Sequence, residues 1–184
     1  MYPVAHVVVS SGAAWSAERV VRRLLRSRHE NAKAESVVAE TGSLFDYRLV
    51  ALGALLPDLI DKPLAWFILN DRVEDNHLFA HTMLFGLSLG LPGLYLARRG
   101  NPLLISLACG VIVHLFCDPV LREPRTLAWP LYGWTFHSTY GKGNGLPVNL
   151  TLDFVLGSIG LVVLWRQWRA GRLWDLALWG ELER

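Results

Sequence analysis

The sequence predicts an all-α fold, a polytopic membrane bundle of four to five helices in which residues 1–184 form one domain. Apolar residues make up 52% of the chain and charged residues only 18%, below the ~25% usual for soluble domains. The apolar residues gather in stretches close to the ~20 residues that cross a bilayer. Low charge and two cysteines exclude a disordered chain and a disulfide scaffold. A net charge of +2 gives no field that would attract nucleic acid, so we expect no such partner.

Four stretches with few or no charged residues form the predicted spans. They are residues 49–69, 78–97, 102–117 and 148–165. The second and fourth match the length of a membrane span, and the third does so if it continues to Leu121. The first requires that two aspartates and a lysine be tolerated, and Pro57 and Pro63 predict a broken or kinked helix there. Gly86 and Gly90, four residues apart, predict a close packing face.

The N-terminal part predicts a short or tilted fifth helix over residues 1–15 and a basic amphipathic cytoplasmic segment over residues 16–48. The arginines that open this segment are Arg19, Arg22, Arg23, Arg26 and Arg28. Such a pattern is typical of a helix on a membrane surface, and a solvated helix and loop is the alternative. Lys and Arg concentrate on the cytoplasmic side of membrane proteins. Their distribution here predicts a multi-pass cell-membrane protein with its N-terminus outside and its C-terminal tail inside.

This topology brings a set of histidines and aspartates to one depth, on the non-cytoplasmic side. The set is His6, Asp58, Asp61, His77, His81, His114 and Asp118. His77 and His81 are four residues apart, as are His114 and Asp118, so each pair shares one face of a helix. The sequence therefore predicts that side chains from separate spans meet at one site.

A divalent metal ion would explain these aspartates in an apolar setting. A buried aspartate costs roughly 2.5–3.5 kcal/mol on insertion scales, and Lys62 alone cannot neutralise three. Histidine and aspartate together suit zinc, our first choice, and also manganese or iron. Seven candidates exceed the four ligands usual for zinc, so either two ions bind or some residues support the ligands. Taken singly, each motif has a simpler reading: chance spacing for the histidines, and helix caps or interfacial positions for Asp58 and Asp61.

Four segments resemble the YdjM-like family of predicted membrane-bound metal-dependent hydrolases. They are LGALLPDLIDKP (52–63), FAHTMLF (79–85), HLFCD (114–118) and EPRTLAWPLYGW (123–134). The resemblance implies that the site residues are His6, Asp58, Asp61, His81, His114 and Asp118. It also implies that Trp129 and Pro130 form a structural element beside the site. The chain departs from the family pattern in having one extra residue between the paired aspartates. A family histidine also falls on Asn76 rather than His77, which makes His81 the better candidate.

The resemblance implies a membrane-embedded metal-dependent hydrolase in which a metal activates water. On this hypothesis the metal ligands are His6, His81, His114 and Asp118. Asp58 or Asp61 then completes a second metal site or acts as general base. A site at membrane depth favours a lipid or lipid-linked substrate, with the bilayer as partner; the sequence indicates no oligomeric state. The alternatives are a non-catalytic protein that binds or conducts a metal ion or proton, and a purely structural membrane protein.

Overall fold

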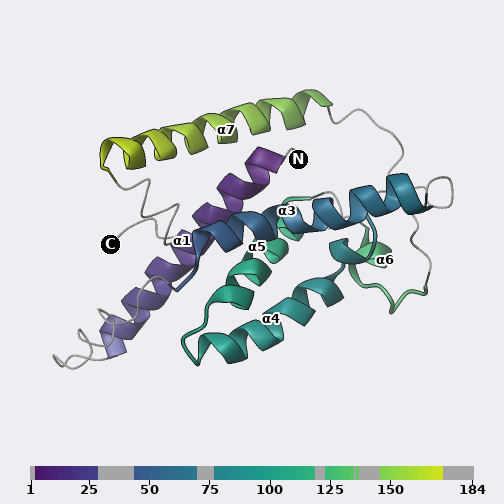
Figure 1. Ribbon diagram of the computed structural model, residues 1–184, viewed down its shortest axis with the longest axis horizontal. Coiled ribbons are helices and arrows are strands. Elements are labelled where there is room, and N and C mark those ends of the chain that lie inside the picture. The colour runs from purple at the N-terminus through teal and green to yellow at the C-terminus, as the bar shows by residue number, and fades with distance from the viewer. Residues whose placement is uncertain are drawn as a thin grey trace.

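The computed structural model describes residues 3–28, 44–69, 77–118, 123–134, 136 and 146–171, and every regular element in them is a helix (Figure 1). The longer helices are α1 (Pro3–Arg28), α3 (Tyr47–Pro63), α4 (Met83–Ala97), α5 (Leu103–Cys117) and α7 (Leu146–Arg169). The shorter ones are the π-helix η1 (Leu64–Leu69), the 3-10 helix η3 (Phe79–His81) and α6 (Pro124–Leu127). The all-α prediction is confirmed over these residues.

The longer helices run in alternating directions, so the bundle has two distinct ends (Figure 1). α3 packs between α1 and α5, α4 covers α5, and α7 lies along α1. One end carries arginines from the ends of several helices, and we call it the basic end. Its arginines are Arg22, Arg48, Arg98, Arg99, Arg166 and Arg169. The histidines and aspartates of the predicted site lie toward the opposite end, at the start of α1, at the ends of α3 and α5, and in and just before η3.

α3 and α5 cross in direct backbone contact, because glycines face the crossing from both helices. A Cβ added to Gly53 would lie 2.2 Å from the carbonyl oxygen of Leu107, and one added to Gly110 would lie 2.2 Å from that of Val50. Gly86 and Gly90, the predicted packing pair, face α5 with ordinary spacing: a Cβ there would meet side-chain atoms at 3.5 and 3.8 Å. The tightest contact of the bundle is therefore at α3–α5.

The observed helix ends differ from the predicted spans where polar side chains cap the helices. The 49–69 stretch is helical throughout, as α3 and then η1, and α3 continues through Pro57. α4 begins only at Met83, because the Thr82 hydroxyl accepts a hydrogen bond from the Phe85 N–H at 3.1 Å. α5 ends at Cys117 with Asp118 as its cap. The expected continuation to Leu121 falls on residues outside those described.

α4 and α5 contain 15 residues each. Over the described residues, no helix has both the length and the apolar character needed to cross a membrane. α1 joins the predicted N-terminal helix to the first part of the basic segment in one helix of 26 residues. The predicted segment extends to residue 48, but Tyr47 and Arg48 already belong to α3. Residues 29–43 of that segment and the tail beyond residue 171 lie outside the described part of the chain.

A buried glutamate ties α1 to α3 at the basic end, and we call this group the Glu18 cluster. Oε1 of Glu18 accepts hydrogen bonds from Arg22 Nε at 2.9 Å, from Arg22 Nη2 at 2.7 Å and from the Leu44 N–H at 3.3 Å. Oε2 accepts one from the Tyr47 hydroxyl at 3.0 Å. Both carboxylate oxygens thus have donors. Tyr47 also packs with Ala14 and Val50 in the apolar core beside the cluster.

Asp46 caps the start of α3 at the same end. Its carboxylate accepts hydrogen bonds from the backbone N–H and the guanidinium of Arg48. Partial burial raises the pKa of Asp46, but the hydrogen bonds from Arg48 outweigh it and leave this pKa below its usual value.

Candidate metal centre

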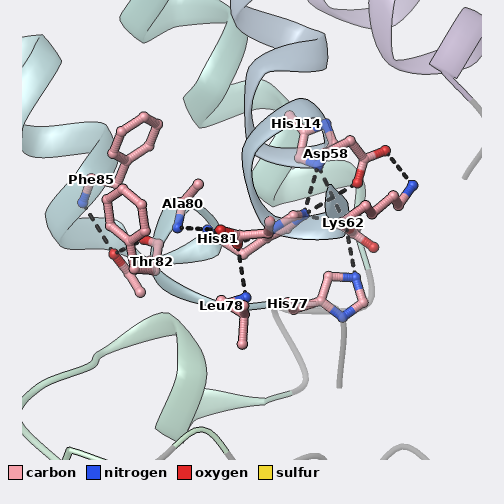
Figure 2. A network of polar contacts seen from close by, with 12 residues as sticks. Asp58, Lys62, His77, Leu78, Ala80, His81, Thr82, Phe85 and His114 are labelled. Atoms are coloured by element: carbon pink, nitrogen blue, oxygen red, sulfur yellow. Dashed lines mark hydrogen bonds and ion pairs between the residues drawn. The ribbon is translucent and has the colours of Figure 1, made fainter. Parts of the chain in front are cut away.

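Four side chains that could ligate one metal ion converge from three segments. Figure 2 labels three of them, Asp58, His81 and His114. Asp58 comes from α3, His81 from η3, and His114 and Asp118 from the last turn and cap of α5. One ligand atom from each lies within 4.8 Å of every other. We call these four residues the candidate metal centre. His81 and His114 are fully buried, Asp118 nearly so, and the Asp58 side chain is 12% exposed.

Several distances between the ligand atoms are close to those expected around a tetrahedral ion. Nε2 of His81 lies 3.2 Å from Nε2 of His114, 3.4 Å from Oδ2 of Asp118 and 3.6 Å from Oδ1 of Asp58. Nε2 of His114 lies 3.4 Å from the same Asp118 oxygen. Ligands bound to tetrahedral zinc at 2.0–2.2 Å are about 3.3–3.6 Å apart. Four of the six ligand-to-ligand distances, at 3.2 to 3.6 Å, are therefore close to the spacing around such an ion, and the remaining pairs lie within 4.8 Å.

A backbone carbonyl fixes the tautomer of His114. Nδ1 of His114 lies 2.7 Å from the carbonyl oxygen of Ala54, which can only accept a hydrogen bond. Nδ1 therefore carries the proton, and in the neutral ring Nε2 presents its lone pair to the centre. The α3–α5 contact makes this bond possible, since Gly110 packs on Ala54 one turn before His114.

Asp61 fixes His81 in the same way. Oδ2 of Asp61 lies 2.7 Å from Nδ1 of His81 and also accepts the Leu78 and His81 N–H groups at 2.8 and 3.1 Å. Oδ1 accepts the Ala80 N–H at 3.1 Å. With both oxygens supplied with donors, Asp61 lies behind His81 and outside the four-residue group. The structure thus gives Asp61, a candidate ligand and catalytic residue from sequence, the position of an anchor for η3.

The candidate metal centre consequently consists of hydrogen-bond acceptors that face one another. Two Nε2 lone pairs and two carboxylate oxygens converge, and the donor groups of both imidazoles point away. An added proton on one ring would satisfy one or two of these contacts, whereas a divalent cation would satisfy all four. The donor set of two histidines and two aspartates suits zinc, manganese or iron.

His6 and His77, the two remaining candidates, flank the centre. The His6 ring stacks on His114 with centroids 4.0 Å apart, and among the described residues its buried Nδ1 has no hydrogen-bond partner. Nε2 of His77 lies 3.4 Å from Oδ2 of Asp118, and its ring meets His81 edge-on at 4.6 Å. All seven predicted residues thus gather at one place, four as the candidate ligand set and three around it.

Lys62 sets the orientation of Asp58. Its Nζ lies 2.7 Å from Oδ2 of Asp58, which leaves Oδ1 facing His81. Lys62 and His77 are also the more exposed side chains here, at 36% and 27%. The open side of the centre is therefore the side on which these two residues lie (Figure 2).

The predicted structural element at Trp129 lies beside the site. α6 packs against η3, the segment that carries His81. The Trp129 ring stacks on Phe136 and meets Trp134 edge-on, with centroids 5.4 Å apart in both pairs. This element therefore lies next to the segment that positions His81.

Fold and site together define a class of protein: a helical bundle with a buried histidine–aspartate group suited to a metal ion. A family profile, that of the YdjM inner membrane protein, matches residues 1–180, and the chain belongs to this family. No curated protein and no solved structure matches the chain. Membership confirms the resemblance carried by the sequence motifs and supports a location in the cell membrane.

Proposed function

We propose that the protein is a membrane-embedded hydrolase that depends on a divalent metal ion, with zinc as first choice and manganese or iron as alternatives. The observation that carries the proposal is the convergence of four acceptors at tetrahedral spacing around His81. A divalent ion in this centre would supply an activated water and polarise a scissile carbonyl or phosphoryl group. The four ligands suffice for one ion, and His6 and His77 are additional imidazoles for a second.

Each residue of the site has a defined part in this proposal. His81 and His114 bind through Nε2, while Asp61 and the Ala54 carbonyl hold their rings and tautomers. Asp118 contributes Oδ2 from the end of α5. Asp58 is the most exposed carboxylate of the group and is placed to bind the ion or to take a proton from water.

Several features support a multi-pass arrangement with the site on the non-cytoplasmic side. The family is described as inner membrane protein. The helices alternate in direction, and most of the described arginines lie at the basic end, away from the candidate metal centre, as the positive-inside tendency predicts; Lys62 and Arg125 lie near the centre. A buried site within a bilayer favours a lipid or lipid-linked substrate.

Metal content tests the proposal directly. We would measure it by mass spectrometry on detergent-purified protein, beside a His81→Ala, Asp118→Ala double variant and an Asp46→Asn control at the basic end. We expect one or two equivalents of a transition metal in the wild type and the control, and none in the double variant. If the double variant does not fold, the single Asp118→Asn variant replaces it. No metal in the wild type, even after zinc or manganese is added, would overturn the proposal.

One observation favours the alternative, a protein that conducts a metal ion or proton without catalysis. His6, Ser10 and Glu18 lie on one face of α1 and are all buried. Ser10 Oγ, like His6 Nδ1, has no hydrogen-bond partner among the described residues. Buried polar side chains thus occur along α1 from the centre toward the basic end, with the apolar Ala14 between Ser10 and Glu18. Zinc uptake into vesicles reconstituted with the protein, abolished by Ser10→Ala, would favour conduction over hydrolysis.

A further inference from the structure

Two short segments near the candidate metal centre expose large apolar and aromatic side chains. Each of these side chains is more than half exposed. The residues are Trp66, Phe67 and Ile68 of η1, and Leu131, Tyr132 and Trp134 after α6. We call them the aromatic rim. No charged side chain is among them.

Both segments of the aromatic rim lie at the end of the bundle that holds the candidate metal centre. η1 begins directly after α3, so that Trp66 follows Asp61 by little more than one helical turn. α6 packs against η3, which carries His81. In Figure 1, α6 and the end of α3 lie at the same end of the molecule.

A second set of exposed aromatic residues lies at the basic end, where arginines cover their rings. The guanidinium of Arg99 lies 4.7 Å from the centre of the Tyr95 ring, and that of Arg169 lies 5.3 Å from that of Trp165. Tyr95 and Trp165 are each about half exposed. Aromatic and basic residues thus occur together at the ends of α4 and α7.

Aliphatic side chains are exposed between the two sets. Along α4 they are Leu84, Leu87 and Leu91, and along α7 they are Ile159, Leu161 and Val162. Trp and Tyr concentrate at the two interfaces of a bilayer and aliphatic residues between them. From Arg48 to Trp66 the helical rise is roughly 27 Å, close to the ~30 Å of a hydrocarbon core.

We propose that the aromatic rim lies in the headgroup region of the leaflet opposite the basic end. The candidate metal centre would then lie at the depth where lipid headgroups join their acyl chains. This inference rests on the proposed function for its substrate class: a membrane lipid whose scissile bond is an ester or phosphoester at that junction. A bond in the middle of an acyl chain, or a water-soluble substrate, does not fit this depth.

Depth-dependent fluorescence quenching tests the placement. In a Cys109→Ala, Cys117→Ala background, a single reporter would be attached at Tyr132→Cys in the rim. A Leu87→Cys variant on α4 and a Tyr95→Cys variant at the basic end serve as matched controls. Each protein would be reconstituted in phosphatidylcholine–phosphatidylglycerol vesicles that carry a spin label near the headgroup or near the chain end.

We expect the reporters at positions 132 and 95 to be quenched about twofold or more better by the headgroup label, and the reporter at position 87 better by the chain-end label. Quenching of position 132 by aqueous iodide alone, with no effect of either lipid, would overturn the placement. Stronger quenching there by the chain-end label would overturn it as well. If Tyr132→Cys does not fold, Phe67→Cys in η1 gives the same test.

Metal content of the same preparations separates this inference from the proposed function. If the headgroup label does not quench the reporter at position 132 more strongly and metal binding is normal, only the placement of the aromatic rim is overturned. If the quenching is as expected but no metal is bound, the proposal of a metal-dependent hydrolase is overturned and the placement of the aromatic rim still holds.

Discussion

The Glu18 cluster and the candidate metal centre are both buried, both contain carboxylates, and lie toward opposite ends of the bundle. They differ in the balance of hydrogen-bond donors and acceptors. Each oxygen of Glu18 has donors, which Arg22, Tyr47 and a backbone N–H provide. In the candidate metal centre, two imidazole lone pairs and two carboxylate oxygens face one another.

This difference teaches how a structural polar group can be told from a binding site. Burial alone does not separate them, because Glu18 and Asp118 are equally exposed at 8%. A buried polar group whose acceptors all have donors needs no ligand, and its hydrogen bonds stabilise the fold. A buried group made up of acceptors needs a cation to satisfy them all, so the stability of the folded protein depends on whether that cation is bound.

The largest effect on stability is expected at the α3–α5 contact, which holds His114 of the candidate metal centre in place. Gly110→Ala would place a Cβ 2.2 Å from the Val50 carbonyl oxygen and separate α3 from α5. We expect a loss of about 3 kcal/mol or more in unfolding free energy, together with loss of metal binding as His114 leaves Ala54. Denaturant unfolding in detergent measures the first and metal content the second. Gly90→Ala, where the nearest atom is 3.8 Å away, is the control, and equal stability of the two variants would contradict the crossing.

The next largest effect is the stabilisation by zinc, which should depend on the candidate metal centre and not on the Glu18 cluster. Zinc at about a hundredfold its dissociation constant should stabilise the wild type by ~2.7 kcal/mol, or about 5–11 °C in Tm. Glu18→Gln should gain the same increment from a lower starting Tm, and the His81→Ala, Asp118→Ala variant none. Because protons compete with the metal ion for the ligand histidines, the increment should fall as the pH is lowered. An increment that persists in the double variant would place the metal elsewhere.

A variant of Asp61 tests how much the residue that holds the ring of His81 contributes to metal affinity. Asp61→Asn keeps the size of the side chain but removes the charge that orients the Nδ1–H of His81. Metal affinity should weaken by about 10–100-fold without being abolished. Titration with zinc and a competing chelator measures this, and Asp46→Asn should bind as the wild type does. Unchanged affinity would show that the backbone N–H groups alone hold η3.

The smallest effect on stability is expected in the Glu18 cluster. Tyr47→Phe removes one of the donors to Glu18 and should cost about 1 kcal/mol. This cost should be the same with and without zinc, as measured by thermal unfolding. Tyr95→Phe, an exposed tyrosine, should change little. A cost that varies with zinc would mean that the two clusters are coupled through α3.

Much of the site could be predicted from sequence, because it depends on topology and helical spacing. Histidines and aspartates near the same end of alternating helices must meet, and the spacing of His114 and Asp118 puts both on one face of α5. The separate positions of Asp58 and Asp61 could not be predicted. Both lie in one helix with similar neighbours, and only the backbone N–H groups of η3 decide which carboxylate anchors and which faces His81.

Other features depend on backbone atoms that carry no signature in the sequence. The Ala54 carbonyl holds His114, yet no property of alanine indicates it. The later start of α4 follows from Thr82 and from the use of the preceding residues to bind Asp61, whereas apolar composition alone placed the start at residue 78. Glu18 sits among basic residues that suggested a solvated surface, and its burial depends on Tyr47 from another helix.

The glycine contact between α3 and α5 has a consequence for how much sequence change the protein tolerates. On the proposed membrane-embedded arrangement, apolar side chains would gain little by leaving acyl chains for another helix, so close backbone approach would supply much of the attraction between helices. Exposed leucines of α4 and α7 could then be exchanged for other aliphatic residues with little effect, whereas any side chain at Gly53 or Gly110 would force α3 and α5 apart. The distance between the ligand-bearing helices is thereby set by main-chain atoms, which substitutions elsewhere in the core leave in place.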